Sequence, residues 1–201
     1  MTNDLYYKIP RRVKIILIFI AVILAAYFIL SFSLAEPKII PQEFLAARRE
    51  ASSISQEIVS LSSKSPESLV KISELDRKGD YADALILITQ ELERNKIARD
   101  KAIELSRKLE IMARNLSKIS PFSAGQIALE AISSETALIS RLISYNDYLV
   151  KLLEVLREKF LSKGDGDGVS DLITKINEEV DNINALDKKF ADLMGKFDLD
   201  F

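Results

Sequence analysis

The sequence predicts an all-α fold in which an N-terminal transmembrane helix is followed by an elongated antiparallel helical bundle, or coiled-coil hairpin. The first observation is composition: of 201 residues, 48% are hydrophobic and 29% charged, with only 6 Gly and 5 Pro, which favours helices. The second is an uncharged, mainly apolar run at residues 15–35. The third is a recurrence of apolar residues at alternating steps of three and four beyond that run, which is typical of packed helices.

The apolar run predicts a membrane anchor. Its 21 residues would make a helix of about 30 Å, the thickness of the hydrocarbon core. Such a segment must satisfy its own backbone hydrogen bonds, so a helix is expected. The basic residues before it are Lys8, Arg11, Arg12 and Lys14. Charges after it are balanced, so the positive-inside rule predicts a cytoplasmic tail (residues 1–14) and an extracytoplasmic part (residues 36–201) of a single-pass cell-membrane protein.

A cleavable signal peptide is the alternative to an anchor. Ser33, Leu34 and Ala35 resemble the small-residue site at which signal peptides are cut. The apolar run is longer than the roughly 7–15 residues of a usual signal core, and Pro37 follows closely. We therefore expect an uncleaved span over residues 15–35, with cleavage after Ala35 left open.

Proline and glycine divide the remaining chain. Pro37 and Pro41 bound a linker (residues 36–41), followed by a bundle over residues 42–198 and a tail of residues 199–201. The expected helices cover residues 42–62, 66–78, 81–120 and 122–161, and a last helix, capped by Ser170 or Asp171, extends to about residue 198. Ser65 and Asp80 are expected to act as N-caps, and Gly79 to end the second helix in a left-handed conformation. Short connections predict antiparallel neighbours, with helix 66–78 as a short element that turns inward.

Heptad stripes predict the core. The expected inward positions are Phe44, Ala47, Ala51, Ile54, Ile58 and Leu61; Leu69, Ile72 and Leu75; Ala98, Ala102, Leu105, Leu109, Met112, Leu116 and Ile119; Leu138, Leu142, Tyr145, Leu149, Leu152 and Leu156; and Val169, Ile173, Ile176, Val180, Ile183, Leu186, Phe190, Leu193 and Phe197. The last stripe has an irregular 3, 3 step across Ile183. Extra apolar residues beside the fourth stripe place that helix at the centre, between two neighbours. Acidic residues such as Glu91, Glu93 and Asp100 are interpreted as solvated.

Residues 79–84 (GDYADA) resemble the centre of a tetratricopeptide repeat. The matching positions are Gly79, Tyr81 and Ala84, followed by Ile88 where a large apolar residue is expected. The positions that depart from the repeat are Ser68, Lys71 and Ile72 in the first helix. No second copy of the motif follows at the repeat spacing, whereas a stable array of such repeats needs several copies. The resemblance implies a helical hairpin with the same kind of turn.

Two further segments carry alternative interpretations. The run KGDGDG (residues 163–168) places Asp165, Asp167 and Asp171 at calcium-ligand spacing, but Lys163 and Thr174 replace the two strongest ligands of an EF-hand loop. A flexible turn is favoured, with calcium binding left open. The C-terminal residues 196–201 alternate apolar and acidic side chains past the expected helix end. That pattern suits capture by strand addition in a partner's groove, whereas a frayed tail is the simpler interpretation.

Composition excludes several kinds of chemistry. The chain has no Cys and no His, so disulfides, thiolate sites and histidine-based catalysis or metal binding are excluded. The net charge of −2, without a basic patch in the bundle, argues against nucleic-acid binding. We predict no catalytic, cofactor-binding or metal-binding residues, no cofactor and no small-molecule substrate. A hydrolase using Ser, Asp or Glu is a minor alternative.

The predicted function is that of a membrane-anchored interaction or scaffold protein of the cell envelope, without enzymatic activity. Its partners would be the lipid bilayer, through the N-terminal helix, and another protein or its own copy. The alternative is an extracytoplasmic helical sensor or ligand-binding domain that acts through a partner, because the short tail of residues 1–14 cannot signal alone.

Overall fold

The computed structural model describes residues 37–161 and 166–199, and these residues confirm the predicted all-α bundle. The chain divides into two units, and every described helix lies in the second, Lys38–Phe201. The predicted basic tail, the transmembrane span and the cleavage site considered after Ala35 lie outside the described residues. None of the described helices combines the length and apolar character that crossing a bilayer requires.

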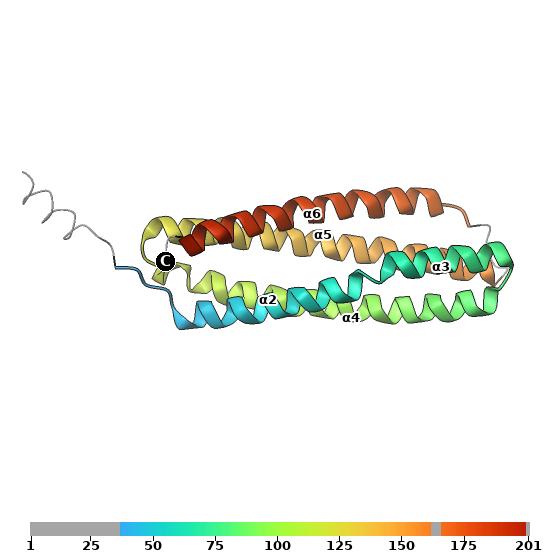
Figure 1. The fold of residues 1–201 in the computed structure, drawn as a ribbon, viewed down its shortest axis with the longest axis horizontal. Helices are drawn as coiled ribbons and strands as arrows, with labels where there is room; N and C mark the ends of the chain where they lie inside the picture. Colours follow the sequence, from blue (N-terminus) through green and yellow to red (C-terminus); the bar gives the residue numbers. More distant parts are fainter. Residues whose placement is uncertain (1–36, 162–165, 200–201) are drawn as a thin grey trace, which may run out of the picture. The chain divides into compact units, whose positions relative to one another are not determined.

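The described helices run lengthwise beside one another (Figure 1). They are α2 (Gln42–Ser62), α3 (Ser65–Lys78), α4 (Tyr81–Arg114), the 3₁₀ helix η1 (Leu116–Lys118), α5 (Phe122–Phe160) and α6 (Val169–Leu199). Helices α2 and α3 both pack on α4, α4 packs on α5, and α5 packs on α6. The longest, α5, has 39 residues and a length of about 60 Å. As predicted, it is central, with a neighbour on each side.

Helix α3 does not turn inward, contrary to the expectation from sequence. It follows α2 in the same direction along α4 (Figure 1). Only Ser63 and Lys64 separate the two helices, and both keep right-handed helical backbone angles. Because neither residue reverses the chain, α2 and α3 form one interrupted arm of the bundle. Helices α4, α5 and α6 then alternate in direction, as the short connections predict.

Several helix ends differ from the sequence-based expectation. The helix expected to reach residue 120 ends at Arg114, where the Asn115 side chain donates to the Ile111 carbonyl oxygen at 3.0 Å and competes with further helical bonding. Ser65 is the first residue of α3 rather than its N-cap, and Asp80 makes no side-chain capping bond. Gly79 does end α3 in the left-handed region, with φ of 73°, as predicted.

The core consists of two apolar clusters placed one after the other along the bundle. The first joins α2 to the C-terminal halves of α4 and α6 and the N-terminal half of α5. The second joins α3 to the opposite halves of α4, α5 and α6. The stripes predicted for α2, the second half of α4 and α5 are buried or partly buried along their length. Heptad spacing therefore identified most of both clusters.

The stripe predicted for α6 is wrong at two positions. Ile173 is 45% exposed and Val180 38% exposed, whereas Glu179 is buried. The inward-facing residues are Ile176, Glu179, Ile183, Leu186, Phe190, Leu193 and Phe197. Their steps alternate three and four without interruption, so the irregular step expected at Ile183 arose from assigning Val180 to the core. Helix α6 keeps its register by burying a carboxyl group.

The start of the described chain is tied to the α4–α5 connection. Within the predicted linker, the Ile39 N–H donates to the Ser120 carbonyl oxygen at 2.8 Å, and the Ser120 N–H donates to the Ile39 carbonyl oxygen at 3.0 Å. The C-terminal end of α6 lies at the same end of the bundle (Figure 1). The segment before α2, the α4–α5 connection and the end of α6 therefore lie together at one end of the bundle and form its end surface.

The C-terminal segment is helical further than predicted. Helix α6 continues to Leu199, so residues 196–199 are helical and do not form the extended segment that the alternative of strand addition requires. Phe197 is fully buried, and its ring lies 5.7 Å from that of Phe44. Asp198 accepts two hydrogen bonds from Arg48, at 2.6 and 2.7 Å. The last two residues lie outside the described part.

Candidate functional site: a buried polar layer

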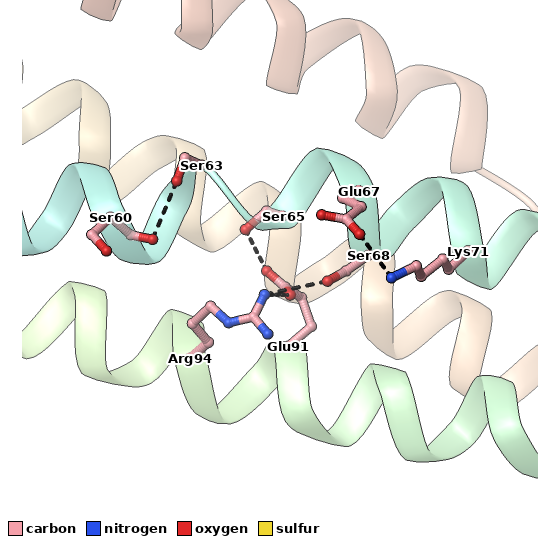
Figure 2. Close-up of polar contacts among 8 residues, drawn as sticks. All are labelled: Ser60, Ser63, Ser65, Glu67, Ser68, Lys71, Glu91 and Arg94. Atoms are coloured by element: carbon pink, nitrogen blue, oxygen red, sulfur yellow. Dashed lines mark hydrogen bonds and ion pairs between the residues drawn. The ribbon is translucent and has the colours of Figure 1, made fainter.

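A layer of polar side chains separates the two apolar clusters. It lies where α2 gives way to α3 and is centred on Glu91 of α4, which has no exposed surface. Figure 2 shows Glu91 and Arg94 of α4 directed toward Ser65 and Ser68 of α3. Burial of a charged group costs free energy unless the group is paired and hydrogen-bonded, so the partners of Glu91 determine what the layer can do.

Both oxygens of the Glu91 carboxylate have a partner. The Ser65 hydroxyl donates to Oε1. The Arg94 guanidinium donates to Oε2 at 2.5 Å and to the Ser68 hydroxyl oxygen at 3.2 Å. The Arg94 side chain is 23% exposed, so one end of this network reaches solvent. The break between α2 and α3 therefore places two serines where they bind the ion pair of α4.

The layer extends across to α5. The Asn95 amide donates to the Asn146 carbonyl oxygen at 3.4 Å, while Asn95 Oδ1 has no hydrogen-bond partner among the described residues. Beside it lies Tyr145, where burial raises the pKa of the phenol, the Glu91 charge raises it further and a hydrogen bond with Ser65 opposes the rise. The Tyr145 hydroxyl therefore stays protonated at neutral pH.

The space within this layer is too small for a substrate. The cavity between the end of α2 and helices α3, α4 and α5 measures about 10 Å³ and is lined by Ser65, Arg94, Asn95, Tyr145 and Asn146, among others. A volume of that size holds at most one water molecule. The arrangement suits a structural role, because polar groups that pair only in one alignment fix the register of neighbouring helices.

Glu135 of α5 forms a second buried polar site, in the cluster that contains α2. Burial raises its pKa to about 7, the Asp187 charge contributes to the rise, and a hydrogen bond from Ser55 opposes it. The Ser55 hydroxyl lies 3.5 Å from Glu135 Oε1. This carboxyl group therefore exchanges a proton near neutral pH, which makes the stability of the bundle depend on pH.

Glu179 of α6 is the third buried carboxylate. Its Oε1 lies 3.5 Å from the Arg141 guanidinium of α5, and its Oε2 has no hydrogen-bond partner within the described part of the chain. Arg141 is half exposed. The pair joins α5 to α6 near the layer around Glu91, at the level where the two apolar clusters meet.

The expectation that Glu91 is solvated is wrong. The inward positions of α4 are Ala84, Ile88, Glu91, Asn95 and Ala98. Their steps of four and three continue the predicted stripe toward the N-terminus of the helix, and that continuity was the signal for a buried Glu91. The carboxylate is buried at this position because Ser65 and Arg94 bind its two oxygens.

The acidic loop that invited a calcium interpretation lies largely outside the described residues, since residues 162–165 are not described. Asp171 accepts a hydrogen bond from Lys175 at 2.6 Å. In residues 37–161 and 166–199, no group of three Asp, Glu, His or Cys side chains is placed to hold a metal ion. Calcium binding by residues 163–168 stays a prediction.

No family model, no curated protein and no solved structure matches the chain. The segment that resembles a tetratricopeptide repeat forms a helical hairpin of α3 and α4, with Ala84 and Ile88 fully buried. Its relation to that family stays a prediction. The described part is a helical bundle in which a buried polar layer lies between two apolar clusters.

Proposed function

We propose that the chain is a membrane-anchored interaction protein of the cell envelope, without enzymatic activity, whose bundle lies outside the cytoplasm. The uncharged residues 15–35 form the anchor in this proposal, and the basic residues before them orient it. Its action would be to hold a protein-binding surface at the membrane. The buried polar layer supports a structural rather than a catalytic role for Glu91, because the adjoining cavity has room for one water molecule.

The observation that carries this proposal is a pair of exposed apolar residues on α6. Ile173 and Val180 are exposed although α6 packs on α5 through its other apolar residues. They are seven residues apart, so they lie on the same face, two turns from each other. Heptad spacing of exposed apolar residues fits the apolar stripe of another helix. The partner in this proposal is therefore a protein that presents a helix to α6.

A photo-crosslinking residue at Val180 of the full chain, in its native membrane, tests this proposal. We expect one protein adduct of discrete mass, identified by mass spectrometry as either a second copy or a defined different protein. The neighbouring position Asp181 is the control, because it is exposed but lies about 100° further round the helix. The expected yield at Asp181 is several-fold lower.

Two outcomes would contradict the interaction role. One is equal adduct yield at Val180 and Asp181, which indicates random collision. The other is absence of protein adducts at both positions together with a monomeric mass in lipid nanodiscs. Loss of the Val180 adduct on replacing Ile173 by Asp, with the helical circular dichroism unchanged, would support a shared face.

A further inference from the structure

We infer that the end of the bundle carrying Ile39, Phe122 and Leu199 lies in the headgroup layer of the membrane, as an interaction surface for lipid. The inference rests on the proposed anchoring by residues 15–35 and goes beyond it. An anchor by itself requires only that the chain cross the bilayer. Here the folded bundle would itself contact the lipid.

Chain length carries the first step of the argument. Ala35 ends the uncharged run, and Ile39 is the residue whose backbone pairs with Ser120. Four residues span at most about 14 Å even when fully extended. The headgroup region is about 5–7 Å thick on each side of the hydrocarbon core. The pairing therefore holds the α4–α5 connection in or next to the headgroups when residues 15–35 span the bilayer.

The side chains at this end carry the second step. Ile39 is 50% exposed, Phe122 72% and Leu199 87%. Phe122 is the first residue of α5, Leu199 is the last of α6, and Ile39 pairs with Ser120 in the α4–α5 connection. The start of α5 and the end of α6 lie at the same end of the bundle (Figure 1). Large apolar side chains exposed together lose contact with water when they enter the interfacial region. These side chains therefore lie at the end of the bundle that the short segment between Ala35 and Ile39 holds next to the membrane.

Charge at the same end is compatible with a lipid surface. Lys38 precedes Ile39, and Lys118 lies in η1 beside the α4–α5 connection. Both lysines are exposed; the Lys118 ammonium donates to Asn115 Oδ1 at 2.8 Å and lies 3.8 Å from Glu43. Long basic side chains reach the phosphates of the headgroup layer while neighbouring apolar groups sit deeper.

Tryptophan fluorescence in vesicles tests the inference, because the chain has no Trp of its own. The full chain is reconstituted into phosphatidylcholine–phosphatidylglycerol vesicles that carry a quencher near the headgroups. Phe122→Trp and Leu199→Trp are two separate probes of the proposed surface. Leu161→Trp is the matched control, since Leu161 is 47% exposed at the opposite end of the bundle. We expect several-fold stronger quenching and a blue-shifted emission for the first two.

The readouts separate this inference from the proposed anchoring. Flotation of the chain with the vesicles reports the anchor, and quenching reports the end surface. Flotation with equal, weak quenching of all three variants would overturn the inference and leave the anchor in place. Failure to float would overturn both. Circular dichroism of each variant identifies a substitution that unfolds the bundle, and the second probe then decides the outcome.

Discussion

Replacing Arg94 by Met is expected to destabilise the bundle by about 3 kcal/mol. The substitution keeps the aliphatic packing of the side chain but removes the cation that pairs with the Glu91 carboxylate at 2.5 Å. Glu91 would then hold an unpaired charge with no exposed surface, and only the Ser65 hydroxyl would remain as a partner. Urea denaturation of the full chain in detergent, followed by circular dichroism, measures the loss.

Two controls make this result specific to the buried pair. Arg114→Met removes a similar pair with Glu110, but those side chains are 75% and 59% exposed, so the expected change is below about 0.5 kcal/mol. Adding Glu91→Gln to Arg94→Met should recover more than half of the loss, because the charge disappears while a hydrogen-bonding group stays. A loss for Arg94→Met no larger than that for Arg114→Met would contradict the structural role assigned to the polar layer.

Replacing Glu135 by Gln is expected to stabilise the bundle above neutral pH. Burial raises the pKa of Glu135 from 4.5 to about 7, so the folded state holds this proton more tightly than the unfolded state. The stability linked to the group is complete below pH 4.5 and is lost as the pH rises through 7. The loss at pH 8 is on the order of 3 kcal/mol, and Gln avoids it. Unfolding midpoints between pH 4.5 and 8 measure the effect.

The comparison with an exposed acid separates this effect from general charge. Glu93→Gln removes a carboxylate on the solvated face of α4 and should leave the pH profile parallel to that of the unaltered chain. The Glu135→Gln profile should be flatter between pH 4.5 and 8. Parallel profiles for all three proteins would show that the Glu135 carboxyl group is not held in the buried environment described above.

Heptad spacing alone was sufficient to predict the helices that pack through apolar residues. The stripe of α2 and the stripe predicted for α5 consist of apolar residues and Tyr145, so position and residue type agree and that part of the core follows directly. The buried Glu135 of α5 lies outside its predicted stripe and was not predicted. Helices α4 and α6 are different. Glu91 and Glu179 occupy inward positions that regular spacing indicates but that their charge argues against. Glu91 pairs with Arg94 three residues further along the same helix, which is a local spacing. The bond from Ser65 to Glu91 and the pairing of Glu179 with Arg141 instead depend on contacts between helices.

Other features of the fold depend on contacts between distant parts of the sequence. The pairing of Ile39 with Ser120 is one backbone bridge between a predicted linker and a predicted turn, and neither segment has a pattern that indicates it. Ser65 carries the sequence signature of an N-cap, yet its hydroxyl binds Glu91. The sequence around Ser65 does not show whether its hydroxyl caps its own helix or bonds to a residue of another helix, because that residue is distant in the sequence.

The most direct test of the proposed anchored topology is a reporter fused after Phe201 that is active only outside the cytoplasm, combined with alkaline extraction of the membranes. The proposal predicts an active reporter on a full-length chain that stays in the membrane after extraction. Replacing Val22 and Ala26 by Asp, at about 2.5–3.5 kcal/mol each in the middle of a span, should release the chain. An inactive reporter, or an unaltered chain that is shortened or washed off at alkaline pH, would contradict an uncleaved anchor with the bundle outside the cytoplasm.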